Sequence, residues 1–120
     1  MDIKLYGKLK KKYSFLSGAS IECGNGWYTL LDVLCDEIQR ELEACKRDGV
    51  RTDFEAVQIK EKYGGLRFYT GGENMVIYGL ICFAESMSRH ICENCGNHGV
   101  LRDGPWVRTL CDKHASIQEE

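Results

Sequence analysis

Two pairs of metal-ligand residues lie near the C-terminal end of this sequence. Two residues separate Cys92 from Cys95, two separate Cys111 from His114, and fifteen lie between the pairs. Three thiolates and one imidazole form the tetrahedral ligand set that Zn²⁺ prefers in closed structural sites. We therefore expect Cys92, Cys95, Cys111 and His114 to bind one structural zinc ion per chain.

The residues around these ligands predict a small zinc-binding fold. Gly96 follows the second cysteine and permits the sharp turn of a zinc knuckle. Residues 100–102 and 106–109 form a predicted hairpin whose turn contains Asp, Gly and Pro. The second ligand pair lies at the start of a predicted helix that runs to about Gln118, so both side chains can face one ion. Knuckle, hairpin and helix together resemble a treble-clef finger, and a zinc-ribbon-like arrangement is the near alternative.

The predicted metal site argues against catalysis. Four protein ligands leave no position for water, so metal-assisted hydrolysis is not expected. A redox role for Cys92 and Cys95 is the alternative, but no thioredoxin-like strand and helix flank them. Nuclease-type treble clefs carry a histidine on the hairpin, which this hairpin lacks; we expect His90 and His98 to be exposed or outside the ligand set. We therefore favour a protein that is not an enzyme, although catalytic groups can also assemble in three dimensions without a local motif.

An amphipathic helix is predicted from Asn25 to the residues before Gly49. Apolar residues recur there at spacings of three, four and seven, and charged residues occupy the opposite side. Asn25 is the expected N-cap, and Lys46 with Arg47 supplies a cationic last turn. Cys35 and Cys45 fall on the apolar stripe, where inert core thiols are expected.

Residues 54–70 show the alternation of a β-hairpin with glycines at its turn. Its inward-facing residues, which we expect to contact the helix, are Val57, Ile59, Leu66 and Phe68. Its outward-facing residues form a strip of cations and an aromatic ring, made of Lys60, Lys62, Arg67 and Tyr69. Strand solubility explains such a strip as well as ligand binding does, so Lys60, Arg67 and Tyr69 are candidate binding residues.

A second helix is predicted from Glu73 or Asn74 to about Arg89. Residues 75–84 are apolar nearly all round, so we expect the hairpin, the first helix and the zinc module to cover this helix on several sides.

The predicted fold class is therefore α+β, with three parts. Residues 1–22 are expected to be a short, loosely packed lead-in that lies across the body through its aromatic residues. Residues 23–90 form a helix–hairpin–helix core, and residues 91–120 form a zinc module packed on that core.

Composition limits the partners and the compartment. The net charge is −2 and the sequence pI is about 5.9, which disfavours general affinity for nucleic acid. A lysine-rich run at residues 8–12 is the local exception. No signal peptide is recognisable, and the longest apolar run is half the length of a membrane span. We expect a cytoplasmic protein with no membrane partner, whose seven cysteines do not form a disulfide framework.

Several motifs together resemble a family of small bacterial and phage proteins of unknown function. They are Gly26-Trp27-Tyr28 with Leu30-Leu31, the stretch Lys60-Glu61-Lys62-Tyr63-Gly64-Gly65-Leu66-Arg67-Phe68-Tyr69, Cys92-Glu93-x-Cys95-Gly96 and Leu110-Cys111-Asp112-x-His114. The resemblance covers about residues 24–115. It implies the architecture and a microbial origin, but no activity.

Two classes of function follow from these observations. The first is a non-enzymatic, zinc-stabilised module that binds a protein partner, such as a phage or mobile-element inhibitor of a host defence or regulatory protein. Exposed aromatic and arginine side chains would anchor that contact. The alternative is a nucleic-acid-binding protein that uses Arg102, Trp106 and Arg108 with nearby basic residues. A small-molecule or enzymatic role around Lys60, Lys62, Arg67 and Tyr69 is a third hypothesis.

Overall fold

The computed structural model describes residues 1–119, and the side chains of residues 1–117. In this range the chain forms four α-helices, α1 (Ile3–Lys12), α2 (Tyr28–Arg47), α3 (Met75–Ser88) and α4 (Asp112–Glu119). Its strands are β1 (Ser20–Glu22), β2 (Glu55–Lys62), β3 (Gly65–Gly71), β4 (Val100–Arg102) and β5 (Arg108–Leu110). The α+β class predicted from the sequence is confirmed.

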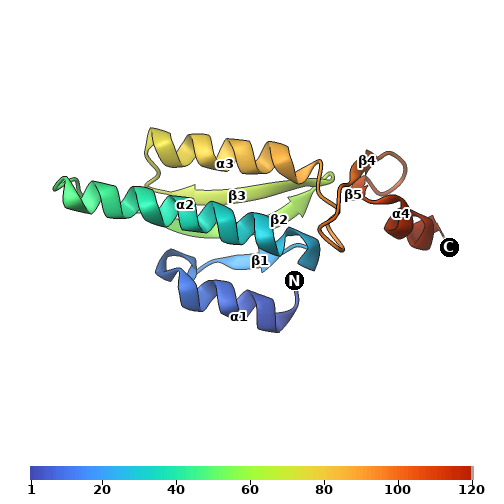
Figure 1. Ribbon diagram of the computed structural model, residues 1–120, viewed down its shortest axis with the longest axis horizontal. Coiled ribbons are helices and arrows are strands. Elements are labelled where there is room, and N and C mark those ends of the chain that lie inside the picture. Colours follow the sequence, from blue (N-terminus) through green and yellow to red (C-terminus); the bar gives the residue numbers. More distant parts are fainter. Residues whose placement is uncertain (120) are drawn as a thin grey trace.

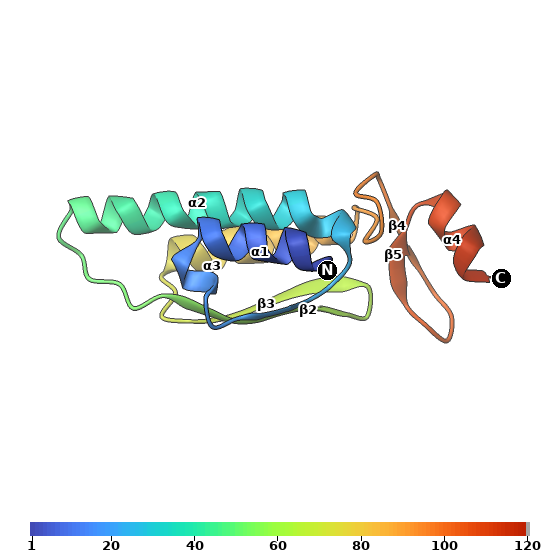
Figure 2. The same ribbon diagram turned by 90° about the horizontal axis from the view of Figure 1, so that it is seen from below.

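Three helices cover one face of a three-stranded sheet. The strand order is β1-β2-β3, with β1 parallel to β2 and β2 antiparallel to β3. Figure 1 shows α1, α2 and α3 side by side in front of this sheet. Figure 2 shows the same helices as one layer above the sheet, and none of the described elements lies on the sheet's other side. The main core therefore lies between the helices and one face of the sheet.

The predicted hairpin is present, with one change in register. Ile59, Leu66 and Phe68 are buried against the helices, as the alternation predicted. Val57 was expected beside them but is exposed, because a β-bulge between Ala56 and Gln58 shifts the register. The extra residue reverses the alternation at that point, and Ala56 takes the buried position instead.

The long helix α2 starts two residues later than the sequence indicated. A 3-10 turn spans Asn25–Trp27 first, and Trp27 is the residue before the helix. Asn25 is therefore not its N-cap; its Oδ1 accepts a hydrogen bond from the backbone N–H of Asp2 at 2.6 Å. The predicted apolar stripe does face the core, where its fully buried residues include Leu31, Cys35 and Ile38.

The N-terminal segment is not a loosely packed lead-in. Residues 3–12 form helix α1, and residues 20–22 add the parallel strand β1 to the sheet. Leu9 and Leu16 are fully buried, and the Tyr13 ring stacks on Phe15 within the same core. The segment therefore completes both layers of the body, through its aromatic residues and also through its leucines.

Helix α3 is covered on fewer sides than expected. Asn74 caps it by accepting a hydrogen bond from the N–H of Ile77, and the buried face packs on α2 and β3. Its exposed apolar residues are Met75, Val76, Tyr78, Phe83 and Met87. The zinc module does not cover them, because it lies beyond the C-terminal end of this helix in Figure 1.

The C-terminal elements form a separate small unit at one end of the elongated body, as both views show (Figures 1 and 2). A knuckle at residues 92–96 is followed by the β4–β5 hairpin and then by α4. This order of knuckle, hairpin and ligand-bearing helix is the treble-clef arrangement. Among the described residues, no helix has the length and apolar character needed to cross a membrane.

Candidate metal centre

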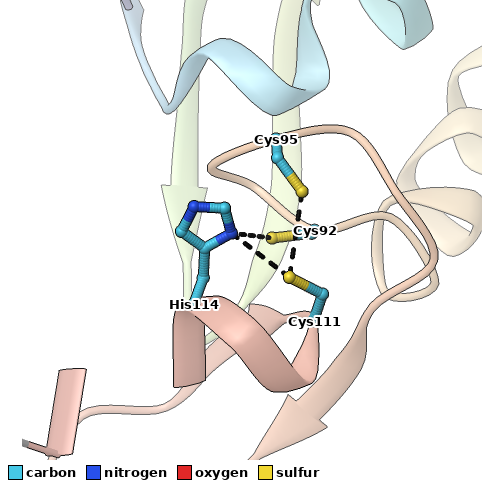
Figure 3. Close-up of side chains that lie close together, drawn as sticks. All are labelled: Cys92, Cys95, Cys111 and His114. Carbon is cyan, nitrogen blue, oxygen red and sulfur yellow. Dashed lines mark hydrogen bonds between the residues drawn. The ribbon is translucent and has the colours of Figure 1, made fainter. Parts of the chain in front are cut away.

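The four predicted ligands converge on one point. Their donor atoms all lie within 4.8 Å of one another. Figure 3 shows the side chains of Cys92 and Cys95 from the knuckle, with Cys111 just before α4 and His114 on that helix. The histidine turns its Nδ1 atom towards the sulfurs, at 3.7 Å from Cys92 Sγ and 3.2 Å from Cys111 Sγ.

These distances fit a tetrahedral metal ion. Zn–S bonds of about 2.3 Å place neighbouring sulfurs about 3.8 Å apart, and a Zn–N bond of about 2.1 Å places nitrogen about 3.6 Å from sulfur. The observed separation of Cys95 Sγ and Cys111 Sγ is 3.8 Å, and the two sulfur–nitrogen distances of 3.7 and 3.2 Å lie on either side of 3.6 Å. Three soft thiolates with one imidazole are a donor set that suits zinc better than hard cations such as Mg²⁺.

The knuckle backbone prepares its first cysteine for metal binding. Cys92 is fully buried, and burial alone raises the pKa of a thiol. Backbone N–H groups of Cys111, Cys95 and Asn94 donate to its sulfur and reverse that effect, lowering the pKa to about 6. The thiolate form that binds metal is therefore stabilised by the fold around it.

A buried carboxylate joins the knuckle to the rest of the chain. Glu93, between the first two ligands, has only 5% of its surface exposed. Its Oε2 accepts a hydrogen bond from the N–H of Gly24 at 2.8 Å, and its Oε1 forms an ion pair with Arg108 at 3.3 Å. Its backbone N–H also donates to the carbonyl oxygen of Thr109 at 3.0 Å. One residue therefore connects the knuckle, strand β5 and the segment before α2.

Two glycines allow this segment to approach the knuckle closely. A Cβ on Gly24 would lie 2.3 Å from the carbonyl oxygen of Glu93, and a Cβ on Gly26 would lie 2.1 Å from that of Cys92. Gly26 donates its N–H to the backbone carbonyl oxygen of Glu93 at 2.7 Å. The fully buried Trp27 donates its indole N–H to the backbone carbonyl oxygen of Ile91 at 2.9 Å. The start of α2 is thus built against the metal-binding loop.

The β2–β3 turn makes the second contact with the zinc module. The hydroxyl of Thr109 donates to the carbonyl oxygen of Gly64 at 2.6 Å. A Cβ on Gly64 would lie 2.4 Å from the Leu101 side chain, so this turn lies directly against strands β4 and β5. The motifs that supported the family resemblance, separate in the sequence, therefore meet at this junction.

The other candidate binding residues fall into two groups. In the zinc module, Arg102 is ion-paired with Asp112 at 2.8 Å and Arg108 with Glu93, whereas Trp106 is 79% exposed. The three candidates on the sheet are Lys60, Arg67 and Tyr69. They alternate with the buried residues of β2 and β3 and so face away from the helices. The structure does not bring the two groups into one site. His90 and His98 are exposed and lie outside the ligand cluster.

Besides the roles of Gly24 and Gly26, sequence reasoning missed those of two further residues at the junction. Glu93 lies between two ligands and looks like an ordinary surface acid, so nothing local predicts its burial. Tyr63 does carry a signal, because it occupies a two-residue hairpin turn at a position that favours asparagine or glycine.

Comparisons of the chain with protein-family models, with curated proteins and with solved structures found no match. The family resemblance of the sequence motifs stays a prediction.

Proposed function

We propose that this chain is a non-enzymatic protein-binding module whose C-terminal unit is stabilised by one structural Zn²⁺ ion. The metal part rests on the tetrahedral fit of four protein donors, which leaves no open coordination position. The binding part rests on one observation at the module–core junction, where Tyr63 and Trp106 are both exposed and line the same hollow.

Tyr63 is held in a backbone conformation that bulky residues rarely adopt. Its φ is +51°, and the next residue, Gly64, has φ +82°. Such left-handed geometry costs on the order of 1 kcal/mol or more for a residue other than glycine, and it is concentrated at functional sites. The ring gains no burial in return, because the residue is 73% exposed. Folding alone does not explain a tyrosine at this position, whereas presentation of the ring to a partner does.

Trp106 faces the same hollow from the zinc module. The hollow measures about 590 Å³ and is lined by Glu61, Tyr63, Gly104, Pro105, Trp106 and Val107. Exposed tryptophan and tyrosine side chains contribute most to binding energy when a partner covers them. The Thr109–Gly64 hydrogen bond holds the β2–β3 turn against strand β5, which reduces the entropy lost on binding.

Affinity capture tests the proposal. The tagged protein, expressed in cells of its source organism, should retain one protein in a 1:1 ratio, and Tyr63→Ala/Trp106→Ala should lose it. Phe83→Ala is the matched control, because it removes another exposed aromatic ring, on α3 and outside the hollow. The proposal fails if the double variant retains the partner as well as the unmodified protein does, or if nothing is captured at micromolar concentration.

A narrower proposal is that the module acts in the cytoplasm as a phage or mobile-element inhibitor of a host defence or regulatory protein. Its support is the resemblance to a family of small bacterial and phage proteins, together with seven cysteines that form no disulfide, which suit a reducing compartment. Titrating the purified chain into the captured partner should reduce that partner's activity with a 1:1 end point. If the partner keeps its full activity when it is saturated with this chain, the inhibitor proposal is wrong and the protein is an adaptor.

Nucleic-acid binding through Arg102, Trp106 and Arg108 receives no support from their placement. Both guanidinium groups form ion pairs inside the module, with Asp112 and Glu93, so neither is free to meet phosphate without breaking a contact.

A further inference from the structure

The uncovered face of the three-stranded sheet carries a group of cations near the β2–β3 turn. Lys60 lies directly opposite Arg67, and Lys62 lies opposite Gly65, so all these positions share the face that points away from the helices. Arg89, at the end of α3, adds its side chain at the edge of the same area. We call Lys60, Lys62, Arg67 and Arg89 the cationic cluster.

Two of these cations are immediate neighbours. A Cβ on Gly65 would lie 3.2 Å from Nε of Arg89 and 3.4 Å from Nη1 of Arg67, so both guanidinium groups lie against the same glycine. The absence of a side chain at this position leaves the room that they occupy. Paired guanidinium groups match the geometry of a phosphate group, which accepts several hydrogen bonds at once.

The positive charges of the cationic cluster are not neutralised by ion pairs with the described side chains. Among residues 1–117, whose side chains are described, no carboxylate oxygen lies within 4.0 Å of any of its four members. The one acid next to it in the strand register is Glu22, opposite Lys60 on β1. Like charges directly opposite one another destabilise a sheet pair, so this arrangement carries a cost that a bound anion would remove.

An aromatic ring continues the same line. Tyr69 lies two residues beyond Arg67 on β3, about 7 Å along the strand, and is 42% exposed on the same face. We propose that this sheet face binds a single-stranded nucleic acid, with the cationic cluster contacting the phosphates and Tyr69 stacking on a base.

The shape and the charge distribution favour this ligand over others. An open sheet face, such as the one seen edge-on in Figure 2, buries too little of a small molecule. A three-stranded sheet is also wider than the two-stranded β-ribbon that the major groove of a duplex admits. A single strand can lie across such a sheet with its bases against aromatic rings. The net charge of −2 does not oppose this, because many of the acids lie on the other layer, in α2: Asp32, Asp36, Glu37, Glu41 and Glu43.

Fluorescence anisotropy with a labelled 12-nucleotide oligo(dT) or oligo(U) tests the proposal on the purified, zinc-loaded chain. Four phosphate contacts predict a slope of about −3 for log affinity against log salt, which is about a 50-fold loss between 50 and 200 mM salt. Lys60→Glu/Arg67→Glu should weaken binding by at least tenfold. Lys8→Glu/Lys11→Glu on α1, with the same change in net charge, should weaken it less than threefold.

Two further measurements keep the test decisive. If circular dichroism shows that the sheet double variant is misfolded, Lys62→Gln/Arg89→Gln takes its place, with an expected loss of at least fivefold. Tyr69→Ala should weaken binding of the oligonucleotide at least threefold while leaving binding of inorganic polyphosphate unchanged. The proposal is overturned by absence of binding at 50 mM salt, by equal losses in the sheet and α1 variants, by equal affinity for duplex DNA, or by polyglutamate competing as well as the oligonucleotide does.

Discussion

At the scale of single residues, the knuckle is positioned by groups that bind no metal. The four ligands were predictable because their spacing is local in the sequence and their chemistry is specific. Glu93, Gly24 and Gly26 were not assigned these roles, because each acts through a contact about 70 residues away in the chain. Long-range contacts of this kind leave no periodic pattern in a sequence.

Gly26→Ala should destabilise the protein strongly. Its new methyl group would lie 2.1 Å from the carbonyl oxygen of Cys92, and backbone must move to relieve that overlap. We expect a loss of about 3 kcal/mol in the free energy of unfolding, measured with urea. Gly79→Ala is the control: no atom outside the neighbouring backbone of its own helix lies within 4 Å of that Cβ, and the exchange inside α3 should raise stability by about 0.5 to 1 kcal/mol. Equal effects of the two substitutions would contradict this account of the junction.

Glu93→Ala should lower the free energy of unfolding by about 2 to 4 kcal/mol, because it removes the acceptor of the Gly24 N–H and the only carboxylate paired with Arg108 among the described side chains. Glu93→Gln keeps an acceptor for Gly24 and should lose about half as much. The comparison pair is Arg51–Asp53, an ion pair of the same type on the surface, where Asp53→Ala should change stability by less than about 0.5 kcal/mol. A loss in Asp53→Ala as large as that in Glu93→Ala would show that burial is not the reason.

At the scale of elements, the sequence predicted α2, α3 and the β2–β3 hairpin because each has a strong periodic pattern. It did not predict α1, whose lysines and glycine obscure a stripe with a single fully buried leucine, Leu9. Strand β1 is only three residues long and pairs with β2, more than 30 residues further along. Because α3 is apolar nearly all round, the sequence predicted that other elements would cover it on several sides. Helix α2 and strand β3 pack on it, but no third element among the described residues covers its remaining apolar side.

The contact between α1 and α2 should make stability depend on pH at both extremes. Burial raises the pKa of the Asp32 carboxyl, but hydrogen bonds from Tyr13 and Lys12 outweigh it and hold this pKa below the ordinary value. The stabilisation is therefore complete above the unfolded pKa of about 4 and is lost as pH falls below it. Burial and the bond to Asp32 raise the pKa of Tyr13, so its contribution is complete below about pH 10 and is lost above that.

Urea unfolding between pH 2 and pH 11 measures this dependence. Tyr13→Phe should lower stability at pH 7 and flatten the pH dependence at both ends, because Asp32 loses its donor and the phenol is gone. Tyr69→Phe, whose hydroxyl has no hydrogen-bond partner among the described residues, should follow the curve of the unmodified protein. If the free energy of unfolding of Tyr13→Phe falls with acid as steeply as that of the unmodified protein, the acid dependence arises from groups other than the Tyr13–Asp32 contact.

At the scale of the whole molecule, the metal should control more than the C-terminal unit. The knuckle supports the start of α2 through Glu93, and the module supports the β2–β3 turn through Thr109. We expect about one zinc ion per chain, and loss of that ion in Cys111→Ser, measured by elemental analysis. A fully folded, metal-free preparation would contradict this expectation.

Trp27 provides a direct readout of this coupling. Its indole is fully buried and donates to Ile91, so loosening of the knuckle should expose it and shift its emission to longer wavelength. The measurement is made on Trp106→Phe, which removes the emission of the exposed tryptophan. Chelation of zinc should then produce a red shift that added zinc reverses. A spectrum that chelation leaves unchanged would mean that the core holds the start of α2 without the metal.

The position of the ligands along the chain also sets an order of assembly during synthesis. The Gly24–Trp27 segment is made before the residues that complete its contacts, which are Ile91, Cys92 and Glu93. The other three ligands follow later still. Until His114 has emerged and a metal ion has bound, the N-terminal end of α2 in a nascent chain lacks the folded knuckle that it packs against. On the proposal that this ion is zinc, we expect the time during which that end is open to chaperones and proteases to depend on how quickly zinc is delivered. In a zinc-starved cell, the amount of this protein should fall before its messenger RNA does.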